Sequence, residues 1–156
     1  MVIGSTGTQL NSLMVVSKGS TPLQALGNTF PFITSFINNM RKIEREMIQA
    51  IIDRSHFSKA NTKVAVHVPM GVDSRAEMRV YLHDNHIATY ANEGLYINHQ
   101  GWKTNTTKSR LNALMQFVLG GLSGIYQKDF EWYLKKVDAG NGKVETSPVP
   151  DSWLLV

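Results

Sequence analysis

The segment from Gly101 to Leu119 constrains the fold more than any other part of the chain. It begins as a polar loop and continues as an amphipathic helix, whose apolar residues recur at intervals of three and four: Leu111, Leu114, Met115, Val118 and Leu119. The glycine pair that starts at Gly120 ends this helix. Because a helix with one apolar stripe has to bury that face against another element, the rest of the chain must supply a partner surface.

The partner surface is predicted to be an antiparallel sheet. Before the helix, short runs rich in β-branched and aromatic residues alternate with turns, which is typical of a β-meander. The predicted strands cover residues 63–70, 77–83, 86–90 and 95–98. The turn pair Asp84-Asn85 joins the second of these strands to the third.

A further hairpin is predicted after the helix. Residues 125–127 and 130–136 are its strands and Lys128-Asp129 is its turn, which places Phe130, Trp132 and Leu134 on one face. The predicted fold class is therefore α+β, with a long N-terminal helix, an antiparallel meander, a second helix packed on the sheet and a C-terminal hairpin.

The long N-terminal helix is indicated by a second apolar stripe. Pro31 suits a first helical turn, and apolar residues then recur at intervals of three and four from Ile33 to Ile52. Such a stripe lines the core of a domain or joins two subunits, and the spacing alone leaves both alternatives open.

The chain is predicted to have three parts. Residues 1–28 form an N-terminal arm, residues 29–137 a single α+β domain, and residues 138–156 a C-terminal tail. The arm carries little charge, so it either lies on another surface or is an unordered terminus. The tail ends in the apolar run from Trp153 to Val156, which we expect to dock on the domain or a partner. Together, the arm, the striped helix and the tail predict a homo-oligomer.

Composition excludes several classes of protein. The chain has no cysteine, which rules out disulfides, thiolate metal sites and a cysteine nucleophile. It has no apolar run of the length that spans a membrane and no visible secretory signal, so the expected location is the cytoplasm. The formal net charge of +4 favours an anionic partner without identifying it.

The loop and first turn of the central segment are the predicted ligand site. Thr106 or Thr107 is the expected N-cap, and the free amide groups at a helix N-terminus favour an anion. The predicted ligand-binding residues carry aromatic, hydroxyl, cationic or amide groups: Trp102, Lys103, Thr104, Thr106, Thr107, Lys108, Arg110 and Asn112. In this hypothesis Trp102 stacks on a base, the two threonine amides, Lys108 and Arg110 hold phosphate, and Asn112 discriminates between ligands.

Structural roles compete with each of these assignments. Trp102 fills the core beneath the helix in the alternative interpretation, and the threonines act only as caps. Arg110 then pairs with Glu131 or Glu77 at the surface. Asn112 ties its loop to the sheet. The sequence alone does not choose between these roles and ligand binding.

Catalysis and metal binding are not expected. Two histidines flank the predicted Asp84-Asn85 turn, but zinc needs three or four converging ligands, and carboxylates are sparse in the β-region. No Gly-rich turn precedes Lys108, so the central segment is not a phosphate-binding loop of the Walker type. We predict no metal, no cofactor and no enzymatic activity.

The central segment also carries a family resemblance. The run Gly101-Trp-Lys-Thr-Asn-Thr-Thr-Lys-Ser-Arg-Leu-Asn follows the strand residues Arg79-Val-Tyr-Leu-His-Asp-Asn-His-Ile-Ala-Thr and precedes Gln127 and Trp132 to Leu134. This pattern resembles a group of small uncharacterised tailed-bacteriophage proteins that carry a GWxTxTTKxRLN run. The resemblance covers roughly residues 63–134. It implies a phage origin and transfers no activity.

These observations lead to one functional hypothesis and two alternatives. The first is a non-enzymatic phage accessory protein that binds a small phosphate-bearing ligand, a nucleotide before others, and sequesters a signal of bacterial defence. The second is a module that binds a host protein or single-stranded nucleic acid, the latter through exposed Arg79, Tyr81 and Tyr96 on one sheet face. The third is a structural assembly protein in which the central segment is a packing corner.

Overall fold

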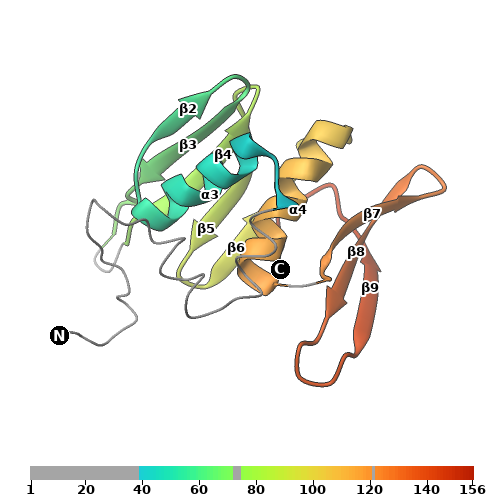
Figure 1. Ribbon diagram of the computed structural model, residues 1–156. Helices are drawn as coiled ribbons and strands as arrows, with labels where there is room; N and C mark the ends of the chain where they lie inside the picture. Colours follow the sequence, from blue (N-terminus) through green and yellow to red (C-terminus); the bar gives the residue numbers. More distant parts are fainter. Residues whose placement is uncertain (1–38, 72–74, 121) are drawn as a thin grey trace. The chain divides into compact units, whose positions relative to one another are not determined.

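The computed structural model describes residues 39–71, 75–120 and 122–156 (Figure 1). The chain divides into two units after Asn39, and the account below concerns the second unit, Met40–Val156. The predicted arm and most of the first half of the predicted N-terminal helix lie outside the described residues. Within them the predicted α+β class is confirmed, with helices, an antiparallel strand meander and a C-terminal hairpin.

The described residues form two helices and two antiparallel sheets. The helices are α3 (Lys42–Asp53) and α4 (Asn105–Leu119). The first sheet has the strand order β10-β6-β5-β4-β3-β2 and consists of β2 (Phe57–Lys59), β3 (Thr62–His67), β4 (Glu77–Leu82), β5 (Asn85–Ala91), β6 (Gly94–Ile97) and β10 (Leu154–Leu155). The second has the order β7-β8-β9 and consists of β7 (Gly124–Lys128), β8 (Glu131–Val137) and β9 (Val144–Pro148).

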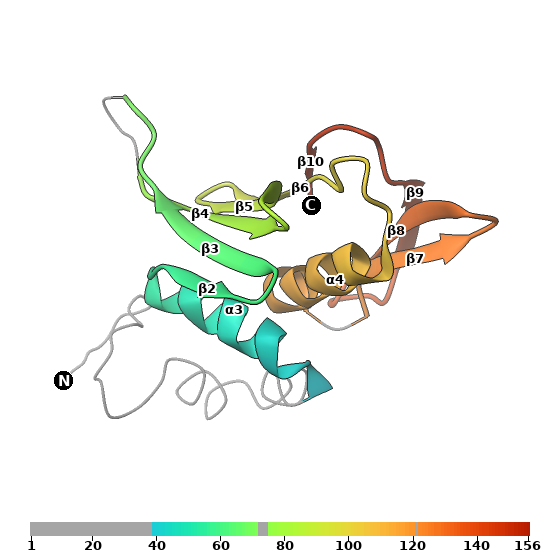
Figure 2. The ribbon, with the colours of Figure 1, turned by 90° about the horizontal axis from the view of Figure 1, so that it is seen from above.

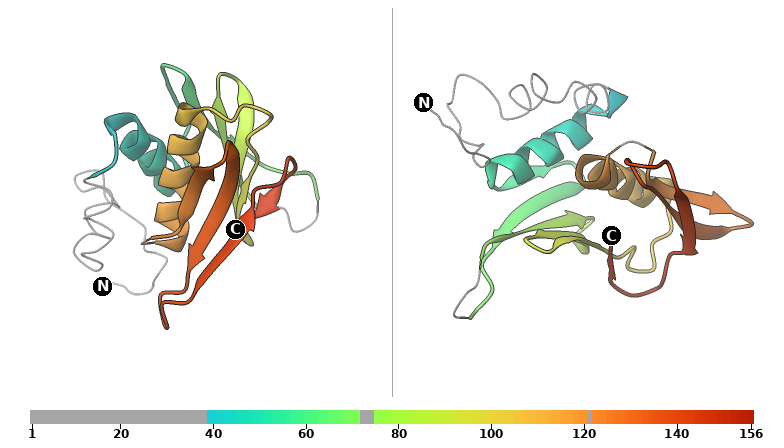
Figure 3. Two further views of the ribbon diagram at one scale, coloured as in Figure 1. Left: turned by 90° about the vertical axis from the view of Figure 1, so that its right-hand side faces the viewer. Right: turned by 90° about the horizontal axis from the view of Figure 1, so that it is seen from below.

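Both helices cover the same face of the six-stranded sheet (Figure 2). Helix α3 contacts β2 and β3, whereas α4 contacts β5 and β6 and, on another side, β7 of the second sheet. The two helices also contact each other. Helix α4 therefore packs against the first sheet, the second sheet and α3 (Figure 3), which explains why its residues from Thr107 to Met115 include six buried side chains.

The core beneath the helices is set by strand register. Val64 pairs with Val80, Val80 with Ala88, and Ala88 with Ile97, so the four side chains form one row across the sheet. All four are fully buried or nearly so. Side chains alternate between the faces of a strand, so most neighbours of these residues project to the opposite face. Ile87, next to Ala88, is the exception: the register shifts there at a β-bulge, and Ile87 is also buried.

Helix α3 begins later than the spacing of apolar residues predicts. Arg41 is extended, with φ −64° and ψ 152°, and acts as the N-cap of a helix that starts at Lys42. The Glu44 carboxylate accepts a hydrogen bond from the Arg41 backbone N–H at 3.1 Å, which satisfies one of the free donors at this end. A single helix continuous through Arg41 is therefore wrong, because the cap interrupts the stripe.

Both tight turns lie one residue away from their predicted positions. The β4–β5 turn is His83-Asp84, and the β7–β8 turn is Asp129-Phe130. All four residues have positive φ, as a two-residue type I′ turn requires. Phe130 consequently leaves the face that buries Trp132 and lies 88% exposed in the turn, so its predicted place on one face with Trp132 and Leu134 is wrong.

Two segments without predicted strands contribute to the sheets. The break after α3 contains β2, which pairs with β3 at the sheet edge. The predicted tail contains β9, which completes the three-stranded sheet, and β10, in which Leu154 pairs with Ile97. The apolar end of the chain therefore docks on the domain through backbone hydrogen bonds to β6, as its composition indicated.

Candidate functional site

The loop between β6 and α4 projects Trp102 from the molecule. The Asn98 side chain accepts a hydrogen bond from the Gln100 N–H at 2.8 Å, and His99 Nδ1 accepts one from the Gly101 N–H at 3.0 Å. Gln100 and Gly101 both have positive φ, so the chain turns sharply here. Trp102 is 58% exposed as a result, and it does not fill the core beneath α4.

The helix that follows begins at Asn105 with Thr104 as its N-cap. The Thr104 hydroxyl accepts a hydrogen bond from the Thr107 N–H at 3.1 Å and lies 3.0 Å from the Thr107 hydroxyl. The predicted cap at Thr106 or Thr107 is therefore wrong by two or three residues. The backbone N–H groups of Asn105 and Thr106 lie in the first turn, where no helical acceptor exists for them.

A pocket of about 290 Å³ opens beside this helix end. One wall comes from the loop and the first turn of α4, namely Trp102, Thr104, Thr106 and Thr107. The other comes from the β4–β5 hairpin, namely Leu82, His83, Asn85 and Ile87. Four of the eight predicted ligand-binding residues thus line one pocket. The hairpin residues were missed, because nothing local in the sequence places this turn next to the α4 loop.

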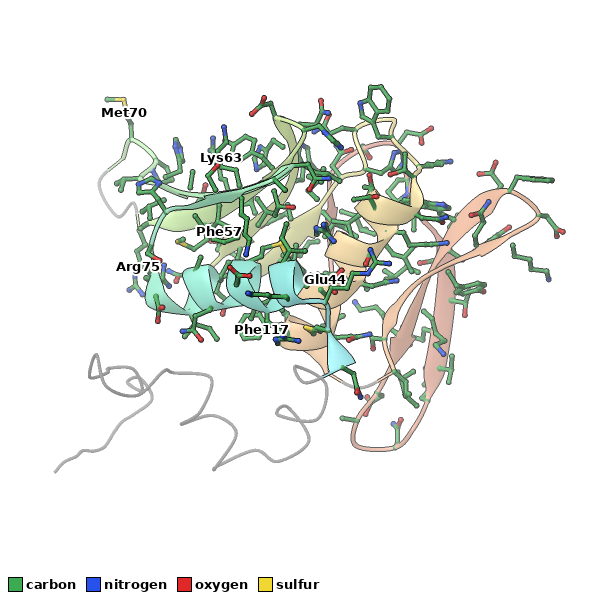
Figure 4. All side chains as sticks on the ribbon, turned by 45° about the horizontal axis from the view of Figure 1, so that its top comes forward. Glu44, Phe57, Lys63, Met70, Arg75 and Phe117 are labelled. Carbon is green, nitrogen blue, oxygen red and sulfur yellow. The ribbon has the colours of Figure 1, made fainter. Side chains whose placement is uncertain are left out.

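Arg110 lies away from the pocket, inside the protein. Its Nη1 donates to Glu44 Oε1 at 3.1 Å and its Nε donates to the Thr62 hydroxyl at 3.1 Å, while Ser109 also hydrogen-bonds to Glu44. The side chains of Arg110 and Glu44 are each only 6% exposed. Figure 4 shows Glu44 on α3 close to α4.

The positive charge of Arg110 is paired with the Glu44 carboxylate within this network. Burial lowers the pKa of the Arg110 guanidinium from its ordinary value, and the nearby Glu44 carboxylate opposes that shift. The group stays protonated, since an arginine does not lose its proton in proteins. Its partner is thus Glu44, and neither of the surface partners expected from the sequence, Glu131 and Glu77, contacts it.

Asn112 is also part of the scaffold. Its amide Nδ2 donates to the Ile125 carbonyl at 3.0 Å, and its Oδ1 accepts from the Ile125 N–H at 2.5 Å. The side chain therefore replaces a strand neighbour at the start of β7 and ties α4 to the second sheet. Gly124 is tightly packed against it, since a Cβ there would lie 3.0 Å from Asn112 Oδ1.

The two predicted lysines differ in their surroundings. Lys103 Nζ lies 3.4 Å from Glu131 and 4.0 Å from Asp151, and His99 Nε2 lies 3.1 Å from the same Asp151 carboxylate. Lys108 forms no ion pair with any residue that the structure describes. Lys108 is therefore the more available cation near the first turn of α4.

The sheet face opposite the helices carries an aromatic row. The rings of Tyr81 and His86 lie 5.1 Å apart between centroids, and Trp153 lies 4.7 Å from His86. Lys63 Nζ lies 5.2 Å from the Tyr81 ring centroid, but it also contacts Asp84 at 3.1 Å. Arg79 on the same face lies 3.4 Å from Glu77. The cations of this face are thus largely paired with carboxylates.

Residues 39–71, 75–120 and 122–156 contain no group of three or more histidines and acidic residues placed to hold a metal ion. Over the same ranges, neither α3 nor α4 has the length and apolar character of a membrane-crossing helix.

Comparison with known proteins places this chain in a phage family. Residues 40–151 match the family model described as Kyanoviridae Gp96 protein, and the chain belongs to this family. The match covers most of the unit described above and confirms the predicted phage origin; it is consistent with an accessory or a structural phage protein. No curated protein and no solved structure matches the chain.

Proposed function

We propose that this phage protein is a non-enzymatic binding protein for a small phosphate-bearing ligand, a nucleotide before others. The observation that carries the proposal is the pocket of about 290 Å³ in which exposed Trp102 lies beside the first turn of α4. Small-molecule sites are concave and largely apolar, contain a few polar groups, and have volumes of about 300 Å³ or more. An aromatic face next to a helix N-terminus suits a base linked to a phosphate.

Each pocket group has a distinct role in this proposal. The base stacks on Trp102, and the phosphate faces the N–H groups of Asn105 and Thr106, with Lys108 adding positive charge. Thr104 and Thr107 hold the helix end in place through their mutual hydrogen bond. Arg110, Asn112 and the paired Lys103 are removed from the set of direct contacts, because their polar groups already have protein partners.

Phage family membership supports one biological use for such a protein. A phage gains from removing nucleotide signals that bacterial defence systems use. A binding protein in the cytoplasm of the infected cell would sequester such a signal without any chemical step, so it needs affinity and no catalytic group.

Titration calorimetry with a panel of cyclic and linear nucleotides tests the proposal. At least one nucleotide is expected to bind, and Trp102→Ala is expected to weaken that binding at least about fivefold, since stacking of a base on an aromatic ring contributes ~1–3 kcal/mol. Trp153→Ala is the matched control, because this exposed tryptophan lies on the open sheet face and not in the pocket. Absence of heat with every nucleotide, or unchanged binding by Trp102→Ala, contradicts the proposal.

Single-stranded nucleic acid is the second candidate ligand, and the aromatic row of the open sheet face favours it. Bases stack on such aromatic groups with little sequence preference. In that case Trp153→Ala would weaken binding to an oligonucleotide and Trp102→Ala would leave it unchanged, which is the reverse of the pattern above. The pairing of Lys63 and Arg79 with carboxylates makes this candidate the weaker one, because affinity for nucleic acid depends on free cations.

A further inference from the structure

The tip of the β7–β8 hairpin holds a residue type that is unfavourable for the stability of its turn. Lys128 pairs with Glu131, so Asp129 and Phe130 form a two-residue turn, with φ 52° and 67°. Type I′ turns of this kind favour glycine at the second position, because a bulky L-residue is disfavoured at positive φ. Phe130 is nevertheless present there and is 88% exposed. Positions that break a local rule are expected where a residue serves function.

The chemistry of the tip matches the chemistry of the pocket. Phe130 offers an apolar ring, and Asp129 next to it offers a carboxylate. The pocket has apolar walls from Leu82, Ile87 and Trp102, and it lies at the α4 end that favours negative charge. A ring with an adjacent anion is the same combination that a nucleotide presents.

The tip and the loop that lines the pocket lie close together. Lys103 follows Trp102 of the pocket, Glu131 follows Phe130 of the tip, and the Lys103 ammonium lies 3.4 Å from the Glu131 carboxylate. With Phe130 88% exposed, the tip does not occupy the pocket of its own chain. Two copies that face each other about a two-fold axis can therefore exchange tips, which produces a closed dimer rather than an open chain.

We infer that Phe130 of one copy inserts into the pocket of a second copy, and that the second copy returns the contact. Asp129 then faces the N–H groups of Asn105 and Thr106 of the receiving chain. The inference goes beyond the proposed function and uses the same pocket with a different occupant. A nucleotide and a partner's tip are thus expected to compete, and nucleotide binding is expected to shift the dimer towards monomers.

Phe130→Gly is the sharpest single variant. Glycine suits the turn, so the monomer is expected to unfold at a higher temperature, whereas removal of the inserted ring raises the dimer dissociation constant at least about tenfold. Leu122→Ser is the matched control, because Leu122 is a second exposed apolar side chain, 72% exposed, outside the tip and the pocket. Sedimentation velocity of the full chain over a range of concentrations measures association, and thermal unfolding measures stability.

A mixing experiment tests the exchange directly. Thr106→Glu places a carboxylate in the pocket where Asp129 would lie, and a glutamate in the first turn is favourable for the helix itself. Phe130→Gly alone and Thr106→Glu alone are each expected to be monomeric. The mixture retains one intact tip and one intact pocket per pair, so it is expected to form a heterodimer with one contact, weaker than the wild-type dimer.

The outcomes separate this inference from the proposed function. It is overturned if the wild-type chain stays monomeric up to about 1 mM, if Phe130→Gly associates as tightly as wild type, or if the mixture does not associate. Nucleotide binding by Phe130→Gly is measured independently by calorimetry, because this variant keeps its own pocket. Failure of that binding contradicts the proposed function and leaves the dimer inference standing.

Discussion

The two ends of the Gly101–Asn112 run have opposite roles in the structure. From Trp102 to Thr106 the side chains line a pocket or reach solvent. Thr107 also borders the pocket but is buried, and Arg110 and Asn112 hold the domain together. The residue types do not separate the two groups, since each contains hydroxyl and amide side chains. What separates them is position relative to the helix, because the α4 face that begins at Thr107 is turned inward.

The largest expected effect concerns the buried end of the run. Arg110→Ala leaves the Glu44 carboxylate buried without its cation, which is expected to lower the free energy of unfolding by about 3–5 kcal/mol. Urea unfolding followed by circular dichroism measures this change. The double variant Glu44→Leu with Arg110→Met removes both charges, so its loss should be smaller than the sum of the two single losses. A loss below about 1 kcal/mol for Arg110→Ala would mean that this residue does not act as scaffold.

Part of this division could be predicted from the sequence. Thr107 and Arg110 precede Leu111 and Leu114 at the spacing of the same helical stripe, so extending the stripe by one turn indicates that both face inward. The two helices, the meander and the second hairpin follow from periodicity in the same way. The partner of Arg110 does not, because Glu44 lies on another helix and periodicity carries no information on contacts between elements.

The pocket also shows that contacts between elements could not be predicted from local sequence patterns. Trp102, Thr104 and Thr106 were predicted from local chemistry, since an aromatic group near a helix start is visible in the sequence. His83 and Asn85 complete the pocket because a hairpin turn meets the α4 loop, a tertiary contact. The observed turns lie one residue away from the predicted ones. His83 and Phe130 have positive φ in these turns, although turns seldom contain such residue types at these positions.

Asn112→Ala is expected to give the next largest loss. It removes both hydrogen bonds to the Ile125 backbone and leaves that part-buried amide and carbonyl without a partner, which costs about 1–3 kcal/mol. Asn105→Ala is the matched control on the exposed first turn of the same helix, and its effect is expected to stay within about 0.5 kcal/mol. Equal losses for the two asparagines in urea unfolding would erase the distinction between the ends of the run.

Thr104 lies at the border between the two ends, so its expected effect is intermediate. Thr104→Ala removes the hydroxyl that accepts from the Thr107 N–H, and loss of an N-cap of this type costs about 1 kcal/mol. Thr104→Ser keeps the acceptor and should recover most of the stability. If the serine variant is as unstable as the alanine variant, the methyl group in the pocket wall matters more than the cap.

The open sheet face adds a pH-dependent contribution. Burial and, second, the positive charge of Arg79 lower the pKa of His86 below its ordinary value of 6.5. The unfolded chain therefore takes up a proton first as the pH falls, so stability is lost below pH 6.5 and the loss levels off below the folded pKa. His86→Gln should unfold with a flatter pH dependence than wild type between neutral and mildly acidic pH. Identical profiles for the two proteins would show that His86 is not the group responsible.

Trp102→Ala is expected to change stability least. This small effect distinguishes the exposed end of the run from its buried end. Trp102 is 58% exposed, so its removal should alter the free energy of unfolding by no more than about 0.5 kcal/mol, while ligand binding falls at least about fivefold. Arg110→Ala should show the inverse pattern in the fraction that remains folded, with stability lost and binding retained. The pair of variants thus assigns each end of the run by two measurements. If Trp102→Ala destabilises the protein as much as Thr104→Ala does, the exposed end is a packing corner, and the pocket loses its main support as a ligand site.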